Sequence, residues 1–271
     1  MSDYQTIENL VIVRGGGDLA TGTIYKLVQC GFSVLVLDIE KPSAIRRNVA
    51  FCQAIYDGRY TVEGMECICC NTIEESFQVM KDGKVAIMVD PKAECLEKVK
   101  PIALIDAILA KKNLGTTKDM APITIALGPG FVAGVDVDAV IETKRGHQLG
   151  RVIYDGAAIK NTGIPGVIQG YGKERVIHSP CDGIVHPIKK ITDIVKKDEI
   201  IAYVDQTPVR ATMDGLLRGM IQGGYHVTKG FKMADIDPRI EEYDNCFTIS
   251  DKARCIAGGV IEALLHLGNI L

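Results

Sequence analysis

The sequence lacks the short motifs that mark several common enzyme classes. It contains no G-x-x-x-x-G-K-[ST] phosphate loop, no H-E-x-x-H pair of metal ligands and no G-x-S-x-G nucleophile turn. These absences leave ATPase, zinc-protease and α/β-hydrolase interpretations without support.

The chain is also poor in the features of nucleic-acid-binding and membrane proteins. Its net charge is −3 and only 6% of its residues are aromatic, so no basic, aromatic surface for nucleic acid is indicated. No apolar run approaches the length of a membrane span, and no charged segment followed by an apolar one opens the sequence. We therefore expect a cytoplasmic protein without membrane or nucleic-acid partners.

Cysteine is frequent but is not arranged as a disulfide framework. The nine cysteines are an odd number and are scattered along the chain, with only Cys67, Cys69 and Cys70 clustered. A strand would place Cys67 and Cys69 on one face, where metal or persulfide chemistry is one interpretation. Because no second pair of cysteines or histidines lies at ligand spacing, small buried apolar residues are favoured, and no metal site is predicted.

The strongest pattern in the 271 residues lies near the N-terminus. An apolar run meets three glycines, Gly15 to Gly17; helix-compatible residues follow, and a second apolar run ends in Asp38. This order of strand, glycine turn, helix, strand and acid is typical of the βαβ unit that binds dinucleotides. In that unit a pyrophosphate lies against the helix N-terminus.

The spacing within this unit gives candidate ligands for a nucleotide. Gly15, Gly17 and Ala20 match G-x-G-x-x-G/A, and Asp38 lies 21 residues beyond Gly17, where an acid binds a ribose hydroxyl. Asp38 favours a free 2′-hydroxyl over NADP, while the arginine pair at 46–47 suits either a phosphate or a solvated surface. The alternative for the glycines is a turn that only packs helix against strand. The predicted cofactor-binding residues are Gly15, Gly16, Gly17, Asp18, Ala20, Thr21, Asp38, Gly128 and Gly130.

The first half of the chain alternates strands and helices. We predict further strands around residues 67–70, over 85–90 and over 123–127, and a helix near 102–112. This alternation predicts an α/β fold with a Rossmann-like doubly wound sheet that is mostly parallel. Ligands lie at the carboxyl ends of strands in such sheets. Asp38, Asp90 and the turn from Gly128 to Gly130 occupy such ends.

The second half becomes β-rich and contains an internal repeat. Residues 179–185 recur as 211–217, and the same offset of 32 residues relates Lys197 to Lys229. Two such units are each too small to bury their apolar faces and should pack on each other. The repeat resembles the biotinyl/lipoyl-like barrel-sandwich hybrid, an all-β module with a modified lysine in the hairpin joining its halves. That junction, 203–210, has no lysine, so the resemblance implies the fold without the swinging arm.

The chain ends in a predicted helix. Ser250 is suited to cap it, and Ile256 and Val260 recur at helical spacing, which indicates a buried face. Gly258 and Gly259 weaken a helix, which implies close packing against another backbone or a nearby ligand. The predicted domains are a Rossmann-like nucleotide-binding domain over 1–172, a barrel-sandwich module over 173–239 and a C-terminal helix over 240–271 that packs back on the first domain.

Several motifs together resemble one family. They lie at residues 14–22, 45–47, 128–136, 140–151, 161–166, 235–239 and 250–253. They are similar to those of the accessory protein of the selenium-dependent molybdenum hydroxylase system, and the resemblance covers nearly the whole chain. The first part is also similar to xanthine dehydrogenase accessory factors. The resemblance implies a maturation factor for a molybdenum hydroxylase client enzyme, with a dinucleotide such as NAD or a molybdenum–pterin cofactor as ligand.

Two other functions fit the same residues. The glycine turn and Asp38 suit an NAD-dependent oxidoreductase, although no catalytic couple accompanies them, and they suit a non-enzymatic nucleotide-binding scaffold. His147 is the candidate catalytic acid or base because histidine titrates near neutral pH, with a surface turn beside Gly146 as the alternative. The sequence leaves open whether a reaction is catalysed, which nucleotide binds and what the oligomeric state is.

Overall fold

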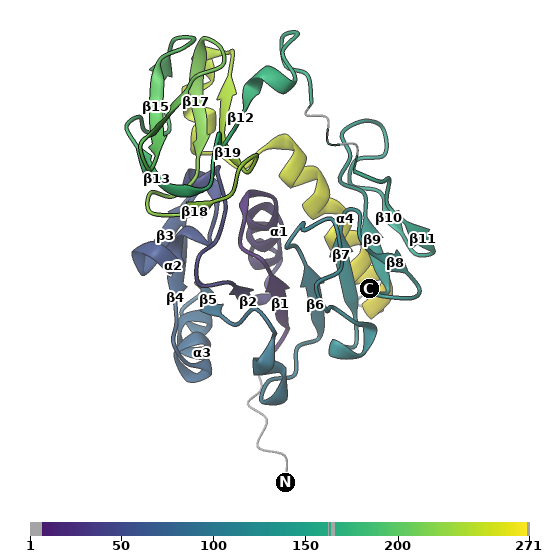
Figure 1. The fold of residues 1–271 in the computed structure, drawn as a ribbon. Helices are drawn as coiled ribbons and strands as arrows, with labels where there is room; N and C mark the ends of the chain where they lie inside the picture. Colours follow the sequence, from purple (N-terminus) through teal and green to yellow (C-terminus); the bar gives the residue numbers. More distant parts are fainter. Residues whose placement is uncertain (1–6, 162, 164–165, 270–271) are drawn as a thin grey trace. The chain divides into compact units, whose positions relative to one another are not determined.

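The computed structural model describes residues 7–161, 163 and 166–269, and these form two compact units (Figure 1). Of the described residues, 7–42, 50–161 and 249–269 belong to unit 1, and 43–49, 163 and 166–248 belong to unit 2. Each unit has its own buried apolar core.

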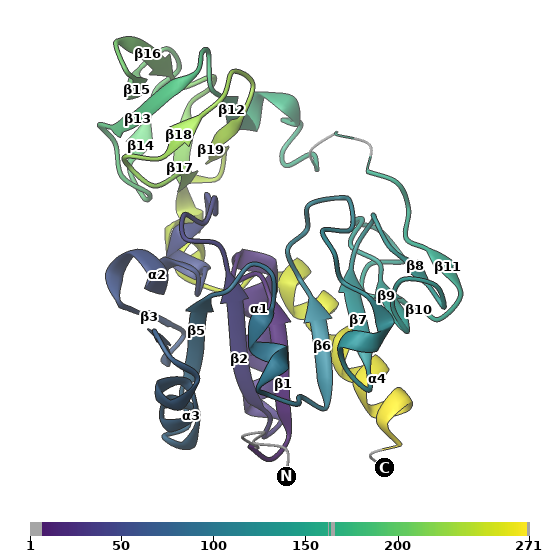
Figure 2. The same ribbon diagram turned by 60° about the horizontal axis from the view of Figure 1, so that its bottom comes forward.

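Unit 1 is built on a nine-stranded mixed sheet in the order β10-β9-β7-β6-β1-β2-β5-β4-β3. Its middle strands are parallel (Figure 2), whereas β3 and β10 pair antiparallel at the two edges. The strands are β1 (Leu10–Arg14), β2 (Ser33–Asp38), β3 (Arg59–Val62), β4 (Met65–Cys69), β5 (Val85–Val89), β6 (Ala103–Asp106), β7 (Thr124–Leu127), β9 (Ala139–Ile141) and β10 (Val152–Ile153), and β8 (Val132–Ala133) pairs separately with β11 (Gly156–Ala157).

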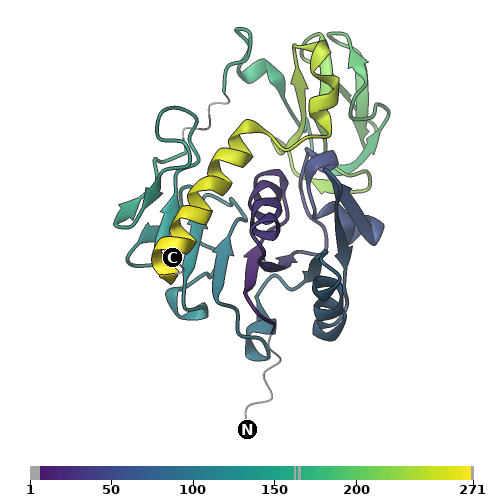
Figure 3. The same cartoon turned by 180° about the vertical axis from the view of Figure 1, so that it is seen from behind.

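Helices cover both faces of this sheet. Phe77 packs with Leu10 and Leu35 in one core. Because successive strand residues point to opposite faces, Val11 and Val34 face the other side of the sheet, where α1 and α4 lie side by side (Figure 3). The α-helices of the described chain are α1 (Asp18–Gln29), α2 (Gln53–Asp57), α3 (Ile73–Lys81) and α4 (Asp251–Gly268).

Close backbone packing fixes α4 in unit 1. A Cβ on Gly22 of α1 would lie 2.7 Å from the Cβ of Ala253, and a Cβ on Gly259 would overlap the carbonyl oxygen of Gly150. A Cβ on Gly258 would have no neighbour within 4 Å. The predicted reason for the glycine pair, close packing on another backbone, is therefore confirmed for Gly259. The predicted cap is also confirmed, because the side chain of Ser250 accepts a hydrogen bond from the N–H of Ala253 at 3.2 Å.

Unit 2 consists of two four-stranded antiparallel sheets, in the orders β12-β19-β17-β14 and β16-β15-β13-β18. Apolar side chains from both sheets, among them Val185, Leu217 and Ile236, form one core. The elements are η1 (Arg47–Val49), η4 (Lys173–Arg175), β12 (Val176–His178), β13 (Gly183–Pro187), β14 (Ile194–Val195), β15 (Ile200–Val204), β16 (Thr207–Arg210), β17 (Gly215–Met220), β18 (His226–Val227), β19 (Lys232–Asp237) and η5 (Ile240–Cys246).

The internal repeat is visible in unit 2 as a set of reciprocal contacts. The N–H of Lys229 donates to Oδ1 of Asp182 at 2.6 Å, and at the equivalent positions the N–H of Lys197 donates to Oδ1 of Asp214 at 2.8 Å. In the same way β13 of the first copy pairs with β18 of the second, and β17 of the second pairs with β14 of the first. Each copy completes a sheet of the other, which confirms that the two copies pack together.

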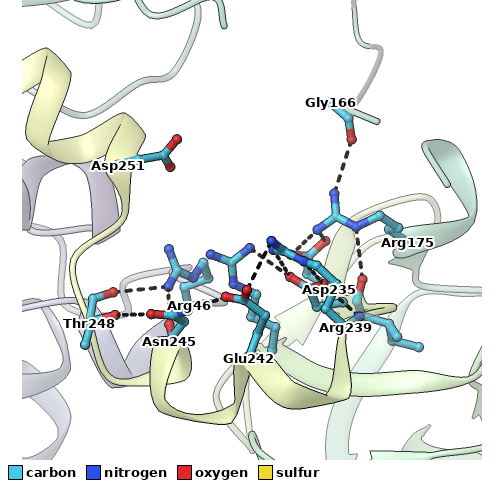
Figure 4. Close-up of polar contacts among 12 residues, drawn as sticks. Arg46, Gly166, Arg175, Asp235, Arg239, Glu242, Asn245, Thr248 and Asp251 are labelled. Carbon is cyan, nitrogen blue, oxygen red and sulfur yellow. Dashed lines mark hydrogen bonds and ion pairs between the residues drawn. The ribbon is translucent and has the colours of Figure 1, made fainter. Parts of the chain in front are cut away.

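An arginine–carboxylate network joins η5 to the sheet of unit 2 (Figure 4). Arg239 donates two hydrogen bonds to the buried carboxylate of Asp237, at 2.9 and 2.8 Å, and pairs with Glu242 at 3.4 Å. The guanidinium of Arg175 lies 3.3 Å from Asp235. Since these guanidinium groups are engaged by carboxylates of the same unit, the network is structural.

The predicted fold class is wrong. In a doubly wound sheet each crossover carries a helix, but in the described part of unit 1 the crossovers that flank β6 contain only the 3₁₀ turns η2 (Glu94–Glu97) and η3 (Lys118–Met120), and the sheet is mixed. The helix predicted near 102–112 is β6 and a loop. Both faces of β6 are buried, so its apolar residues do not alternate with polar ones. Without that alternation the sequence pattern does not distinguish a strand from a helix.

Unit 2 likewise corrects the second part of the predicted fold. Its strands form two small antiparallel sheets built from the repeat, in place of the predicted barrel-sandwich hybrid module. The domain boundaries expected after residues 172 and 239 stay a prediction, because a division by packing does not establish which segments fold independently.

Candidate functional site

The three glycines of the turn after β1 differ in what surrounds them. Gly15 has a φ of +92°, and a Cβ there would lie 2.9 Å from the carbonyl oxygen of Ala107. A Cβ on Gly16 would lie 3.0 Å from the backbone nitrogen of Cys52, whereas a Cβ on Gly17 would meet nothing within 4 Å. Packing within unit 1 therefore requires glycine at the first two positions, and open space adjoins the third.

Helix α1 begins at this open position. Gly17 is its N-cap and no side chain caps it, in contrast to α3 and α4, which are capped by Thr72 and Ser250. The first amides of an uncapped helix need acceptors and carry the positive end of the helix dipole. The N-terminus of α1 is therefore suited to an anion.

Two predicted ligands of this turn have structural roles. The hydroxyl of Thr21 donates to the carbonyl of Gly17 at 2.9 Å and accepts the N–H of Phe51 at 2.9 Å. Ala20 is fully buried. Asp18 is the acidic residue in the first turn of α1, a position that the helix dipole favours.

Asp38 lies at the end of β2 and is tied to the glycine turn. Its Oδ2 accepts the N–H of Gly16 at 2.7 Å, and its Oδ1 accepts the N–H of Ile39 at 2.7 Å. Burial raises the pKa of this carboxyl, and the two backbone hydrogen bonds oppose that effect. Each carboxylate oxygen keeps a further lone pair, so Asp38 can still accept a ligand hydroxyl.

A buried network at the same edge was not predicted. Arg14 donates to the hydroxyl of Thr116 at 2.5 Å and to the carbonyl of Pro91 at 2.8 Å, and the hydroxyl of Thr116 donates to Asp106 at 2.6 Å. Burial raises the pKa of Asp106, while Thr116, Ile108 and Arg14 act in the opposite direction. The network joins the ends of β1 and β6 to the loops that follow β5 and β6, and so it supports the glycine turn. The signal that could have found it is a charged residue at the end of an apolar strand.

Gly128 and Gly130 were predicted to bind the cofactor. Gly128 follows β7 at the carboxyl edge of the sheet, and a Cβ there would lie 2.5 Å from the hydroxyl of Thr143. A Cβ on Gly130 would lie 2.6 Å from the backbone nitrogen of Lys112. Both have positive φ, so the fold itself requires glycine at these positions. Their role as ligands stays a prediction.

A second group of charged residues lies where β9 ends and α4 begins. Glu142 is buried and accepts the N–H groups of Lys144 and Ile159 at 2.7 and 2.8 Å. Arg145 holds Asp251 through two hydrogen bonds of 2.6 and 3.0 Å.

His147, the candidate acid or base, is exposed on the turn that follows Arg145. That turn is closed by a hydrogen bond from the N–H of Leu149 to the carbonyl of Gly146, at 3.1 Å. The structure gives His147 no polar partner that would orient it for proton transfer among the residues described. Its catalytic role stays a prediction.

The cysteine cluster has the character of buried apolar residues. Cys67 is fully buried on β4, and burial raises its pKa well above the usual value, with Cys52, Cys70, Cys69 and Glu66 adding to the effect. Burial likewise raises the pKa values of Cys69 and Cys70. Thiols held in the neutral form are poor nucleophiles and poor metal ligands. Among residues 7–161, 163 and 166–269, no group of three or more histidine, cysteine and acidic side chains is placed to hold a metal ion.

The same residues contain no helix with the length and apolar character of a membrane span.

Comparison with known proteins gives one close relative of unstated activity. No family model matches the chain. The chain is 49% identical over 259 residues to the uncharacterized protein YqeB of Escherichia coli (strain K12), a match that covers 95% of this chain and 48% of that protein. The chain thus spans about half the length of this curated relative.

Solved structures resemble the chain only weakly. The apo ectoine utilization protein EutE of Ruegeria pomeroyi is 11% identical, with 83% of this chain and 85% of that chain covered and a TM-score of 0.25. A succinylglutamate desuccinylase/aspartoacylase of Rhodobacter sphaeroides is 14% identical, with 84% of each chain covered and a TM-score of 0.24. An aspartoacylase family protein of Mesorhizobium loti is 12% identical, with 79% and 59% covered and a TM-score of 0.24. At such TM-scores these structures assign neither a fold nor an activity to this chain.

The family expected from the sequence is corrected by these comparisons. No family model matches the chain and the relative of 49% identity is named only as uncharacterized, so neither comparison supports an accessory protein of molybdenum hydroxylases. The glycines of the motifs also have a structural explanation. A Cβ on Gly15, Gly16, Gly22 or Gly150 would lie close to backbone atoms, so packing alone accounts for glycine at these positions, whatever the family. The predicted maturation of a selenium-dependent molybdenum hydroxylase is therefore withdrawn, whereas the expected partner enzyme and cofactor stay predictions.

Proposed function

We propose that unit 1 binds a nucleotide, with its phosphates at the N-terminus of α1 and its ribose at Asp38. The observation that carries this proposal is the contrast within the turn: Gly15 and Gly16 are held tightly by their own fold, whereas Gly17 adjoins open space at an uncapped helix N-terminus. Backbone N–H groups and the helix dipole together bind phosphate in this geometry.

Asp38 supplies the second contact. Its carboxylate is oriented by Gly16, the middle residue of the turn, so a ligand that contacts the α1 N-terminus lies beside it. A ribose hydroxyl donates to such a carboxylate, whereas a 2′-phosphate would be repelled by it. The proposed ligand is therefore a nucleotide with a free 2′-hydroxyl.

Calorimetric titration of the whole chain with ADP, NAD, NADP and adenosine tests this proposal. We expect binding of ADP and NAD, weaker binding of NADP because of repulsion by Asp38, and weaker binding of adenosine because it has no phosphate. Equal affinity for adenosine and ADP would contradict a phosphate site, and absence of binding by all four compounds would contradict the proposal as a whole.

A further inference from the structure

The buried carboxylate of Asp237 in unit 2 is shared unequally by two arginines. Its Oδ1 accepts the backbone N–H and the Nε–H of Arg239 at 3.1 and 2.9 Å, and its Oδ2 accepts Nη2 of Arg239 at 2.8 Å. The fourth contact is longer, from Nη1 of Arg218 to Oδ2 at 3.3 Å. Because a carboxylate has about four lone-pair sites, Asp237 is saturated, and most of its capacity goes to Arg239.

Arg218 of β17 is left with most of its own hydrogen-bonding capacity unused. Only 17% of its side chain is exposed, and its Nε is buried without a hydrogen-bond partner. Among residues 7–161, 163 and 166–269, its guanidinium contacts one acceptor, Asp237, and does so through Nη1 alone. A guanidinium carries five N–H donors, and buried donors without acceptors are costly. The edge formed by Nε and Nη2 of Arg218 is therefore available to an acceptor from outside the chain.

The surroundings of Arg218 are cationic. Gly219, the next residue of β17, lies against a second arginine, since a Cβ there would be 3.5 Å from Cγ of Arg46. Burial raises the pKa of the Cys246 thiol, and the charges of Arg218 and Arg46 oppose that effect. Figure 4 shows Arg46 and Arg239 beside η5. Three arginines thus gather in one part of unit 2, and such a group favours an anion.

We propose that Arg218 binds an oxyanion, the phosphate or carboxylate group of a small ligand, through the Nε–Nη2 edge that Asp237 leaves unused. That edge presents two parallel N–H donors, which match two oxygens of such a group. Arg46 adds positive charge, whereas Arg239 and Arg175 stay engaged by carboxylates of the same unit. Because Nε is shielded from solvent, a neighbouring side chain has to move as the ligand binds. The site lies wholly within unit 2, so it does not depend on the nucleotide site proposed for unit 1.

NMR spectroscopy of the arginine Nε–H signals tests this site on the whole chain. The signal of Arg218 is identified by its loss in Arg218→Met, and the probes are inorganic phosphate and acetate, each compared with sodium chloride at the same ionic strength. We expect a saturable shift of the Arg218 signal with at least one probe, and the preferred probe identifies the class of oxyanion. The Nε–H of Arg210 is the matched control and should not shift, because this arginine is exposed and donates to the carbonyl of Asp198.

The backbone amides of Leu217 and Gly219 extend the measurement to variants. Arg218→Met should abolish their saturable shift. Arg218→Lys should weaken binding by about 10-fold or more, because an ammonium keeps the charge but not the paired donors. Arg210→Met should bind the probe like the wild type. Phosphate bound at the N-terminus of α1 would be the same in all these proteins, so it cannot produce the difference.

Two results would overturn the inference. One is an Arg218 signal that responds to phosphate and to acetate no more than to sodium chloride. The other is an affinity that Arg218→Met leaves unchanged. Asp237 keeps its three hydrogen bonds from Arg239 in that variant, so the protein should stay folded and the comparison with the wild type stays valid.

Discussion

The N–H of Gly16 donates a hydrogen bond of 2.7 Å to Oδ2 of Asp38, and this contact ties the glycine turn to the end of the neighbouring strand. The two residues are 22 positions apart in the sequence, yet the parallel pairing of β1 with β2 places them at one edge of the sheet. The carboxylate is thereby oriented before any ligand arrives, which lowers the cost of binding.

Nucleotide binding should depend on pH through Asp38. Burial raises the pKa of this carboxyl, so its ionised form, which accepts a ribose hydroxyl, is lost at a higher pH than for an exposed aspartate. ADP affinity should therefore fall as the pH is lowered through the raised pKa. Calorimetric titrations at a series of pH values measure this, and Asp38→Asn should bind ADP weakly with no such dependence. A pH profile shared by the wild type and the variant would show that another group titrates.

The buried network of Arg14, Thr116 and Asp106 should contribute strongly to stability. Asp106→Ala removes the carboxylate and leaves the guanidinium of Arg14 buried without its counter-charge, which should cost about 3–5 kcal/mol in the free energy of unfolding. Asp106→Asn keeps an acceptor for the hydroxyl of Thr116 and should cost less. Urea denaturation of both variants measures the difference. Equal, small losses would mean that the network does not stabilise the fold.

The two adjacent glycines of α4 should respond in opposite directions to alanine. Gly259→Ala forces a Cβ into the backbone of Gly150 and should destabilise unit 1 by about 1–3 kcal/mol. Gly258→Ala adds a methyl group to open space and should stabilise the helix by up to about 1 kcal/mol. Thermal unfolding of the pair is a matched comparison, and destabilisation by both variants would contradict the packing described here.

Unit 2 should lose stability in acid through Asp237. Burial alone would raise the pKa of this carboxyl, but the hydrogen bonds and charges of Arg239 and Arg218 outweigh it, and the pKa is lowered. A lowered pKa contributes stability above the unfolded value of about 3.9, which is lost as the pH falls through the folded value. Asp237→Asn should cost about 2 kcal/mol at neutral pH and remove that acid dependence. Unfolding curves that show the same acid dependence in the variant would contradict this.

Local patterns predicted the elements of the chain better than their assembly. The run into Gly15, the helix-compatible segment over 19–28 and the cap at Ser250 follow short-range rules, and the structure has a strand, a helix and a cap there. The repeat was visible in the sequence because residues recur at an offset of 32, and the backbone contacts of Lys197 and Lys229 follow the same offset.

Other features depend on residues far apart in the sequence. The partners of Arg14 lie 77 and 102 residues away in the sequence. The position of Arg14 at the end of an apolar strand is a local signal, but the identity of its partners cannot be predicted from a local pattern. The segment at 102–112 was misassigned because a strand buried on both faces carries no alternation.

Nucleotide binding by unit 1 depends most directly on the open space beside Gly17, and calorimetric titration of Gly17→Val with ADP tests this. The backbone at this position has a φ of −67° and a valine Cβ would meet no neighbour, so the variant should fold like the wild type and place its side chain where the phosphate binds. Gly258→Val is the matched control, since a Cβ there also meets open space but the residue belongs to α4 and not to the turn. We expect loss of ADP binding in Gly17→Val and wild-type affinity in Gly258→Val. Wild-type affinity in a folded Gly17→Val variant would contradict the account.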